Sequence, residues 1–409
     1  MPAADSSQRT GRRSLIPAIT VTVALSLLLV IQAAVTPNAQ SGAATPVFPR
    51  EVADYSWWTG MLSSSSVDAA TMVYQNGAGV ESMDYPQAVL LGADGGAYRR
   101  LDAAESLGIA ADQGDPAARV LSADGTFVVI GKADGGGGVE VTRLGGNDGR
   151  SVVVGDGLSI IPVSIAADGR SVLILTSETT LSPVFDDDFK LHGALALLDL
   201  ETGTVREYVD LTDVSGAALS PDGTSIVADT GTGLVVLDAA TGEAADVRLS
   251  ADTGRLDGDA WSPDGRRFAL LSGSVLRIVD VTAAEPVEEA VTLRGVAFGS
   301  AIGWRDTSTV LVHTRAEAEV NDSEFSWVDV ASGAREPFAS YAPDFPRASL
   351  IAPDVARDLV PRWRVDDREV DRGPPPLALT IPLAVLVGLV AWILTPRRRI
   401  PRSPAGAVQ

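Results

Sequence analysis

The chain has 409 residues, a formal net charge of −21 at neutral pH, 45% hydrophobic residues and no cysteine. This length is sufficient for a large hydrophobic core that needs no disulfide bonds. The acidic excess argues against nucleic acid as a partner, because an acidic surface and a phosphate backbone repel each other.

The N-terminal region contains a long stretch without charge, residues 14–35. A helix of this length can cross a hydrocarbon core of about 30 Å. The stretch is also compatible with a cleaved secretory signal, since small residues near Ala43 could form a processing site. We predict a cytoplasmic tail over 1–13, a transmembrane helix or signal anchor over 14–35, and a linker over 36–51.

Three aromatic residues follow the linker closely: Tyr55, Trp57 and Trp58. We expect them to pack as a cap against the domain that comes next. Contact with the membrane interface or with a partner is the alternative, because Trp and Tyr are favoured at such surfaces.

Four copies of one short phrase recur along the middle of the chain. Each copy ends in Asp-Gly and precedes a β-rich run. The Asp and Gly residues of the four copies are Asp124, Gly125, Asp168, Gly169, Asp222, Gly223, Asp264 and Gly265. In the Ser-Pro-Asp-Gly form, proline fixes φ and aspartate suits the next position. Glycine then takes the left-handed conformation that closes a hairpin.

The spacing of the phrase indicates the architecture. The four aspartates and a degenerate fifth copy at Asp306 follow one another at steps of 44, 54, 42 and 42 residues. A second phrase, Asp-x-x-Thr-Gly or Asp-x-x-Ser-Gly, is interleaved with the first at Asp199, Asp238 and Asp329. Two hairpins per period give four strands, which make one blade of a β-propeller.

The repeats resemble the WD-repeat-like blades of the TolB-type propeller family. In that family an aromatic residue or leucine precedes Ser-Pro-Asp-Gly and a hydrophobic strand follows. The resemblance covers about residues 116–340. The chain lacks the separate α/β domain that precedes the propeller of TolB, so the family's partner-binding role is not carried over. The predicted fold class is all-β, a propeller over 52–355 with a transmembrane helix on either side.

Six blades are predicted. They occupy residues 66–103, 116–155, 160–212, 214–250, 256–294 and 297–340. A seventh blade, built from 46–65 together with 341–355, is the alternative. Two segments depart from the repeat, 177–191 and 315–324, and insertions in repeat proteins often cluster on the binding face. We therefore expect a partner to contact these two segments.

The C-terminal region mirrors the N-terminal one. Residues 356–376 alternate in charge and end in three prolines, which predicts a stiff juxtamembrane linker. Residues 377–395 form a second uncharged stretch of transmembrane length, and 396–409 form a basic tail.

Clustered arginines next to the two apolar stretches predict the orientation of the chain. These arginines are Arg12, Arg13, Arg397, Arg398 and Arg399. By the positive-inside rule, both termini lie in the cytoplasm. The propeller then lies on the extracytoplasmic side of the cell membrane, as part of a multi-pass protein.

Residues suited to catalysis are scarce. The chain has only two histidines, His192 and His313, and no Gly-x-Ser-x-Gly nucleophile motif. The glycine run 135–138 lacks the lysine of a phosphate-binding loop, so we expect a hairpin loop there. We predict no catalytic residue and no cofactor.

Two acidic clusters are weak candidates for a metal site. The first is Asp186, Asp187 and Asp188, within the insertion 177–191; the second is Asp257 with Asp259. Calcium prefers oxygen ligands, and several carboxylates at short spacing can supply them. Neither cluster matches an EF-hand loop, and a hydrated acidic surface is the alternative.

These features favour a non-catalytic function. We expect a membrane-tethered extracytoplasmic propeller that binds a protein or peptide partner. The alternative is an exported enzyme, or a quinoprotein-like cofactor-binding propeller that uses its central channel, since propellers host many activities. The scarcity of histidine and the missing nucleophile motif favour the binding module.

Overall fold

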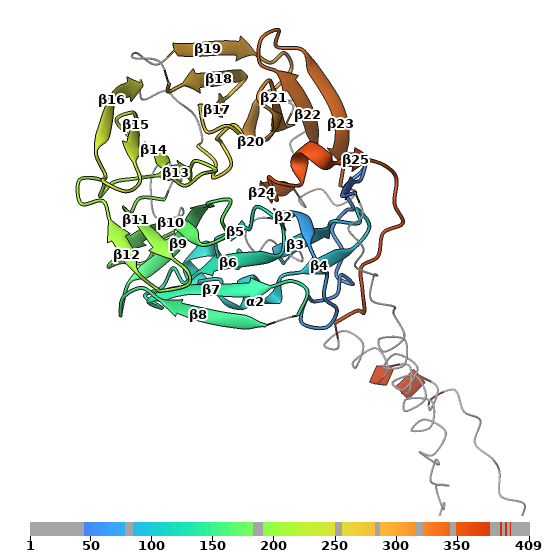
Figure 1. Ribbon diagram of the computed structural model, residues 1–409. Coiled ribbons are helices and arrows are strands. Elements are labelled where there is room, and N and C mark those ends of the chain that lie inside the picture. The colour runs from blue at the N-terminus through green and yellow to red at the C-terminus, as the bar shows by residue number, and fades with distance from the viewer. Residues whose placement is uncertain are drawn as a thin grey trace, which may run out of the picture. The chain divides into compact units, whose positions relative to one another are not determined.

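The computed structural model describes residues 45–77, 85–146, 148–182, 191–249, 256–282, 287–315, 322–343 and 349–376, together with 385, 386, 389, 390 and 393. The chain divides into two compact units, one of residues 38–373 and one of residues 1–37 with 374–409. Within the described residues, the larger unit is a ring of six blades, each a sheet of three or four strands (Figure 1). The predicted all-β, six-bladed propeller is thus confirmed.

The strands of each blade follow one another along the chain, apart from one strand of blade one. Blades one to three consist of β24 (Leu350–Val355), β2 (Ala70–Asn76), β3 (Gln87–Gly92) and β4 (Tyr98–Arg100); β5 (Arg119–Leu121), β6 (Phe127–Gly131), β7 (Gly138–Arg143) and β8 (Gly149–Val153); and β9 (Ser159–Ile165), β10 (Ser171–Ser177), β11 (Ala194–Asp199) and β12 (Val205–Glu207). Blades four to six consist of β13 (Gly216–Leu219), β14 (Ser225–Asp229), β15 (Leu234–Asp238) and β16 (Ala244–Leu249); β17 (Arg267–Ser272), β18 (Val275–Asp280) and β19 (Val287–Thr292); and β20 (Phe298–Asp306), β21 (Thr309–Arg315), β22 (Ser323–Asp329) and β23 (Arg335–Tyr341).

Blade one closes the ring by joining distant parts of the sequence. Its innermost strand β24 pairs antiparallel with β2, and Val355 lies opposite Met72. Residues 341–355, which could have belonged to a seventh blade, therefore complete blade one. The other candidate segment, 46–65, supplies only β1 (Val47–Phe48), which pairs in parallel with β25 (Arg364–Val365). The seven-bladed alternative is wrong because β2 takes its inner partner from the C-terminal side.

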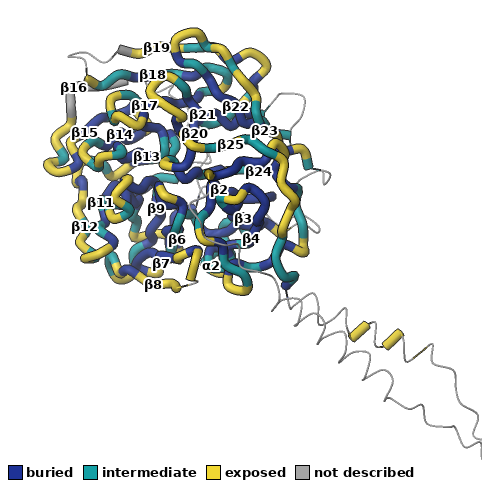
Figure 2. The backbone as a smooth tube through the Cα atoms, turned by 45° about the vertical axis from the view of Figure 1, so that its right-hand side comes forward, coloured by how far each residue is buried: buried dark blue, intermediate teal, exposed yellow. Residues whose placement is uncertain are grey.

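In each four-stranded blade the first strand lies near the axis and the fourth lies at the rim. In the three-stranded blade five, segment 256–261 takes the inner position, and Trp261 pairs with Phe268 of β17. The innermost strands β24, β5, β9, β13 and β20 contact their neighbours around the centre of the ring. Strands β9 and β13 are mostly buried, whereas the rim strands β8 and β12 are mostly exposed (Figure 2). The hydrophobic core lies between adjacent blades; Val129 and Val141 of blade two, for example, belong to one cluster with Ile174 and Leu198 of blade three.

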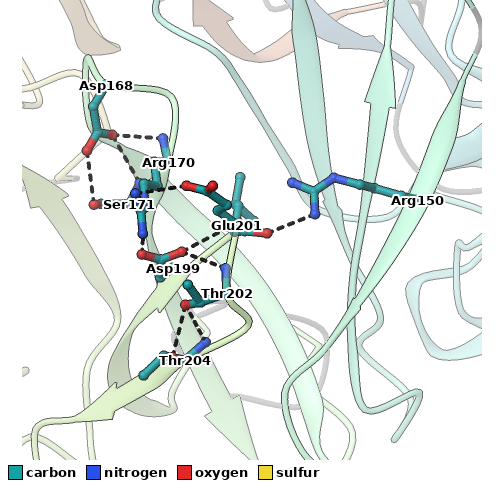
Figure 3. Close-up of polar contacts among 9 residues, drawn as sticks. Arg150, Asp168, Arg170, Ser171, Asp199, Glu201, Thr202 and Thr204 are labelled. Carbon is teal, nitrogen blue, oxygen red and sulfur yellow. Dashed lines mark hydrogen bonds and ion pairs between the residues drawn. The ribbon is translucent and has the colours of Figure 1, made fainter.

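Both repeat phrases form turns at the same end of the ring, which we call the turn end. In blade three, the first turn carries Asp168 and Arg170, and the second carries Asp199 and Glu201 (Figure 3). Arg170 Nε donates to Asp199 Oδ2 over 2.7 Å, and its Nη1 lies 2.8 Å from Glu201 Oε2. Backbone contacts reinforce the link, since the Leu200 N–H donates to the Arg170 carbonyl. The two turns therefore support each other directly.

The first phrase holds its own turn together with local hydrogen bonds. In blade two, Ser122 Oγ donates to Asp124 Oδ1 over 2.8 Å and accepts the N–H of Phe127 over 3.0 Å. Ser220 and Ser262 make the same pair of bonds in blades four and five. The four turn glycines Gly125, Gly169, Gly223 and Gly265 have φ between 66° and 74°. Residues with a side chain rarely adopt this conformation.

The opposite end of the ring, which we call the loop end, carries the longer and less regular connections. Here the second and third strands of each blade are joined, and each blade is joined to the next. The link from blade one to blade two contains α2 (Asp102–Ser106) and a 3-10 turn, η1 (Ala110–Asp112). We expected partner contacts in segments 177–191 and 315–324. Their described ends, 177–182 with 191 and 315 with 322–324, lie at this end, and residues 183–190 and 316–321 lie outside the described residues.

The predicted linker 356–376 packs against blade one as far as Gly373. It contains η2 (Val360–Arg362), and the ring of Trp363 lies 4.6 Å from that of Phe48 between centroids. The N–H of Tyr98 in β4 donates to the Asp371 carbonyl over 2.8 Å. Arg99 Nη2 lies 2.8 Å from Asp371 Oδ2. The segments before β2 and after β24 thus form a strap along blade one.

In the part of the chain that the structure describes, none of the helices has the length and apolar character needed to cross a membrane. The apolar stretch 14–35, the orienting arginines and most of 377–395 lie outside the described residues.

Candidate functional site in the central channel

A cavity of about 710 Å³ lies at the centre of the ring. Residues from all six blades line it, including Arg119 of β5, Ser164 of β9 and Asp354 of β24. The loop end contributes part of the wall as well, from Leu107 and Ile109 in the link between blades one and two. The cavity is therefore bounded both by the regular inner strands and by segments that depart from the repeat.

Blade five contributes two carboxylates through a segment that runs close to blade three. The Gly258 carbonyl accepts a hydrogen bond from Ser164 Oγ over 2.8 Å. The same hydroxyl oxygen accepts the N–H of Leu219 over 3.0 Å and so links blades three, four and five. A Cβ at position 258 would lie 2.3 Å from the Val163 carbonyl oxygen, so only glycine permits this approach. Its neighbours Asp257 and Asp259 line the cavity.

Arg357 reaches this segment from the end of blade one. Its Nη1 lies 3.7 Å from Asp259 Oδ1, and its Nη2 donates to the Ile165 carbonyl of blade three. Both partners are well enclosed, because the side chains of Arg357 and Asp259 are each 10% exposed. Asp259 Oδ2 and Arg357 Nε are buried without a hydrogen-bond partner. The ion pair therefore uses only part of the hydrogen-bonding capacity of the two groups.

Asp354 forms a close carboxyl pair with Asp259. Its Oδ2 accepts the N–H of Leu121 over 2.6 Å. Burial raises the pKa of Asp354 well above its usual range, and the adjacent Asp259 raises it further. Burial also raises the pKa of Asp259, against the opposing effect of Arg357. Two neighbouring carboxyl groups in a desolvated site do not both ionise readily, so the pair with Asp259 and burial together disfavour the ionised form of Asp354.

Arg119 is a second cation of this site, and it lines the cavity directly. It begins β5, where it lies opposite Ile130. Burial lowers the pKa of Arg119 to about 10, although Asp354, Glu105 and Asp115 partly offset this effect. The guanidinium is still protonated at neutral pH. Its Nε and Nη2 are buried and have no hydrogen-bond partner.

Of the two predicted acidic clusters, one lies in the channel. Asp257 and Asp259 both line the cavity. The other cluster, Asp186, Asp187 and Asp188, lies outside the described residues. Among the residues that the structure describes, no three or more His, Cys, Asp or Glu side chains come together as a metal site. Asp257 and Asp259 are instead part of a mixed site with two arginines.

Sequence reasoning missed Arg119, Asp354 and Arg357. A weak signal exists in the repeat itself, because β5 begins with a charged residue where β13 of blade four has only Gly and Ala before Leu219. Asp354 similarly interrupts an otherwise uncharged strand. A charged side chain on an innermost strand points either into the channel or into the core. Burying the charge in either place costs free energy unless a partner or a ligand compensates for it.

The two histidines, the glycine run and two tryptophans at equivalent positions of blades five and six have structural surroundings. His313 is buried in β21, and Trp261 and Trp304 are buried, each with its indole N–H donating to a carbonyl of the preceding blade. His192 Nδ1 lies 2.7 Å from Asp213 Oδ1. Residues 135–138 lead into β7 in the hairpin between β6 and β7, as expected. Neither histidine lines the channel cavity.

The aromatic residues before blade one do not cap the ring. Trp57 is 43% exposed and Trp58 is 49% exposed. Tyr55 donates its hydroxyl to the Tyr85 carbonyl over 3.0 Å, which fixes the segment to the start of blade one. Arg372 fixes the residues on either side of the two tryptophans, because it donates to Thr59 Oγ1 and to the Asp54 carbonyl. The two indoles are thus held at the surface and not in the interior.

Comparison with known proteins gives only weak likenesses. No protein-family model and no curated protein matches the chain. A protein assigned as TolB from Agrobacterium tumefaciens is 20% identical with a TM-score of 0.41, covering 55% of this chain and 80% of its own. Kuenenia stuttgartiensis hydrazine synthase is 16% identical with a TM-score of 0.39, covering 54% and 66%. A chain of the mitotic checkpoint complex is 16% identical with a TM-score of 0.37, covering 54% and 64%. The propeller assignment therefore rests on this chain's own sheets.

Proposed function

We propose that the protein is a membrane-tethered, extracytoplasmic propeller that acts by binding, with its central channel and loop end as the binding surface. The observation that carries the proposal is the channel cavity of about 710 Å³, within the size range of small-molecule sites. Its wall combines apolar side chains with a few charged groups, as ligand sites do. A peptide segment presented by a larger partner could enter the same cavity.

The composition of the cavity wall supports binding over catalysis. The hydroxyl of Ser164 is occupied by backbone groups of blades four and five, and both histidines lie elsewhere. Asp354 is likewise engaged with the backbone of Leu121. A nucleophile needs a base within hydrogen-bond reach, and no described hydroxyl of the wall has a histidine base.

The tether is supported by the sequence at both ends of the propeller. Residues 14–35 and 377–395 are uncharged and long enough to span a bilayer, and arginines flank them on the sides away from the propeller. Holding a binding surface near the membrane raises its effective concentration toward any membrane-bound partner. Modest affinity would then suffice.

Site-specific photo-crosslinking in intact cells tests the binding face. A crosslinking amino acid is placed at Thr179 or Thr232 at the loop end, with Thr202 and Thr241 at the turn end as matched exposed controls. We expect adducts of defined mass from the first pair only. Equal adducts from all four positions, or adducts from the turn end alone, would contradict the proposed face. Turnover of a substrate that depends on Asp259 or Asp354 would favour an enzyme.

A reporter that is active only in the cytoplasm, fused after Gln409, tests the topology. We expect the reporter to be active while protease added outside the cell digests the propeller. A C-terminal tail that outside protease can reach would contradict the orientation, whatever the result for the binding face.

A further inference from the structure

Arg119 presents one complete hydrogen-bonding edge with nothing bound to it. The Nε and Nη2 atoms of an arginine donate in the same direction, side by side. In Arg119 both atoms are buried, and neither has an acceptor among the described residues. A buried donor without a partner is unfavourable, and such groups in folded proteins usually meet a water, an ion or a ligand.

The nearby carboxyl groups leave this edge of Arg119 without an acceptor. Asp354 accepts the N–H of Leu121 at one oxygen and lies beside Asp259, which together with burial raises the pKa of Asp354. Glu105 is paired with Arg100, whose Nε donates to Glu105 Oε1 over 2.9 Å. Asp115, the third carboxyl group that attracts Arg119, likewise leaves Nε and Nη2 without an acceptor. Arg119 is therefore a cation in the channel wall with two donors that no described residue satisfies.

The second pair of charged groups offsets its own charge. Arg357 lies beside Asp259, so the two side chains together carry little net charge. Apolar side chains surround these groups, among them Ile161, Val163 and Ile302, which line the same cavity. A ligand that fits this wall needs an apolar body and one anionic group directed at Arg119.

We propose that Arg119 is the receptor for the carboxylate of a ligand with an apolar body, a proposal that rests on the channel being the binding site. A carboxylate is planar, and its two oxygens match the paired N–H groups of a guanidinium edge. The shared chemistry is the carboxylate group; it could belong to a free monocarboxylic acid or to the C-terminal residue of an apolar peptide.

Binding of defined probes to the full chain in detergent tests the proposal. The free probes are hexanoate, with hexanol and hexylamine as matched controls of the same chain length. The peptide probe is an acetylated Val-Val-Leu with a free C-terminus, compared with its amide. We expect saturable calorimetric binding of one or both carboxylates and none of the three controls. The probe that binds more tightly identifies the source of the carboxylate.

Substitution of Arg119 separates a receptor from a structural group. Arg119→Met keeps an unbranched apolar stem and removes the donors, and we expect carboxylate binding to weaken by at least about tenfold. Arg119→Lys should retain an intermediate affinity, because lysine supplies a point charge without the paired edge. Arg170→Met at the turn end is the control and should bind as the unmodified chain does.

The melting temperature provides the second readout. Because Nε and Nη2 of the guanidinium are buried without partners among the described residues, Arg119→Met should melt at the same temperature or higher. A melting temperature several degrees lower would show that Arg119 holds the fold together and would overturn the proposal. Carboxylates that bind no better than the alcohol or the amine would overturn it too. Binding of neutral probes in the channel, unaffected by Arg119→Met, would leave the proposed binding function standing and reject only the carboxylate.

Discussion

The two ends of the ring are built by opposite means. At the turn end, each blade repeats the same short hairpins, and the polar side chains bond to backbone groups within a few residues, as Ser122 and Asp124 do. At the loop end, the connections differ from blade to blade, and their contacts reach across the sequence. The Leu181 N–H, for example, donates to the Ala133 carbonyl of another blade.

This difference separates the parts of the molecule that specify the fold from those that specify its function. Local turns that satisfy most of their own polar side chains can be repeated from blade to blade, and they fix strand register. The loop-end segments do not have to repeat from blade to blade. They help to form the channel wall together with the inner strands. Variation is thus concentrated where a ligand would enter.

The largest effect that sharpens this comparison concerns two glycines with the same φ. Gly125 at the turn end has φ of 74° and Gly231 at the loop end has φ of 72°. A Cβ at Gly125 would lie 2.2 Å from the Ala70 carbonyl oxygen, whereas a Cβ at Gly231 meets nothing within 4 Å. We expect Gly125→Ala to lower the free energy of unfolding by about 2–5 kcal/mol, the sum of backbone strain and overpacking. Gly231→Ala should lower it by only about 1–2 kcal/mol, from strain alone. Denaturant titration of both variants measures the difference, and equal losses would show that the two ends are equally tolerant.

The second effect concerns the indoles that join neighbouring blades beside the turn end. Trp304 Nε1 donates to the Ala260 carbonyl over 2.8 Å, and Trp304 is buried. Trp304→Phe keeps an aromatic ring but removes one of the two donors to that carbonyl, which also accepts the Ala269 N–H over 2.9 Å. We therefore expect a loss of about 0.5–1.5 kcal/mol, the usual net contribution of one hydrogen bond. Trp57→Phe, at an exposed position near the loop end, should cost less than about 0.5 kcal/mol. A loss at Trp57 as large as that at Trp304 would indicate that the exposed aromatic segment is part of the core.

The sequence was sufficient to predict the six blades because their signal is local. Turn chemistry, spacing and alternating hydrophobicity depend on residues close together in the chain, and Gly125 or Asp199 can be assigned from its immediate neighbours. The closure of blade one was harder to predict. Strand β24 carries neither phrase, and its partner β2 lies near the other end of the propeller's sequence. Nothing local distinguishes a strand that completes the first blade from one that begins a seventh.

The channel site was only partly predictable for the same reason. Asp257 and Asp259 attracted notice because they are neighbours in sequence. Arg119, Asp354 and Arg357 are single charges in separate segments, and ring closure alone brings them together. Their roles follow from burial and missing partners, which have no counterpart in the linear pattern.

A smaller effect is the pH dependence that arises from the channel. The folded-state pKa of Asp354 lies above its unfolded value of about 4, so the unfolded chain releases this proton first as the pH rises. The group therefore costs stability progressively above about pH 4, with a slope of at most about 1.4 kcal/mol per pH unit. Asp354→Asn keeps an acceptor for the Leu121 N–H and removes this titration. We expect the variant to gain stability over the unmodified chain between pH 4 and 7, as measured by denaturant titration at each pH. An unchanged difference across this range would mean that Asp354 is ionised in the folded chain.

The smallest effect has the opposite sign and comes from the turn end. Hydrogen bonds from the N–H of Thr202, assisted by Arg170, lower the pKa of Asp199 to about 2 in the folded chain. This group contributes stability above its unfolded pKa of about 4, and the contribution is lost as the pH falls through about 2. Asp199→Asn should therefore flatten the acid limb of the stability curve below pH 4 and leave the region above pH 4 parallel to that of the unmodified chain.

Glu201→Gln is the matched control, since Glu201 is 72% exposed and pairs with the same arginine. We expect it to leave the acid limb nearly unchanged, because an exposed ion pair contributes little. If both substitutions flatten the acid limb equally, the ion pair with Arg170 and not the turn hydrogen bonds controls Asp199, and the turn end is less self-contained than its geometry indicates.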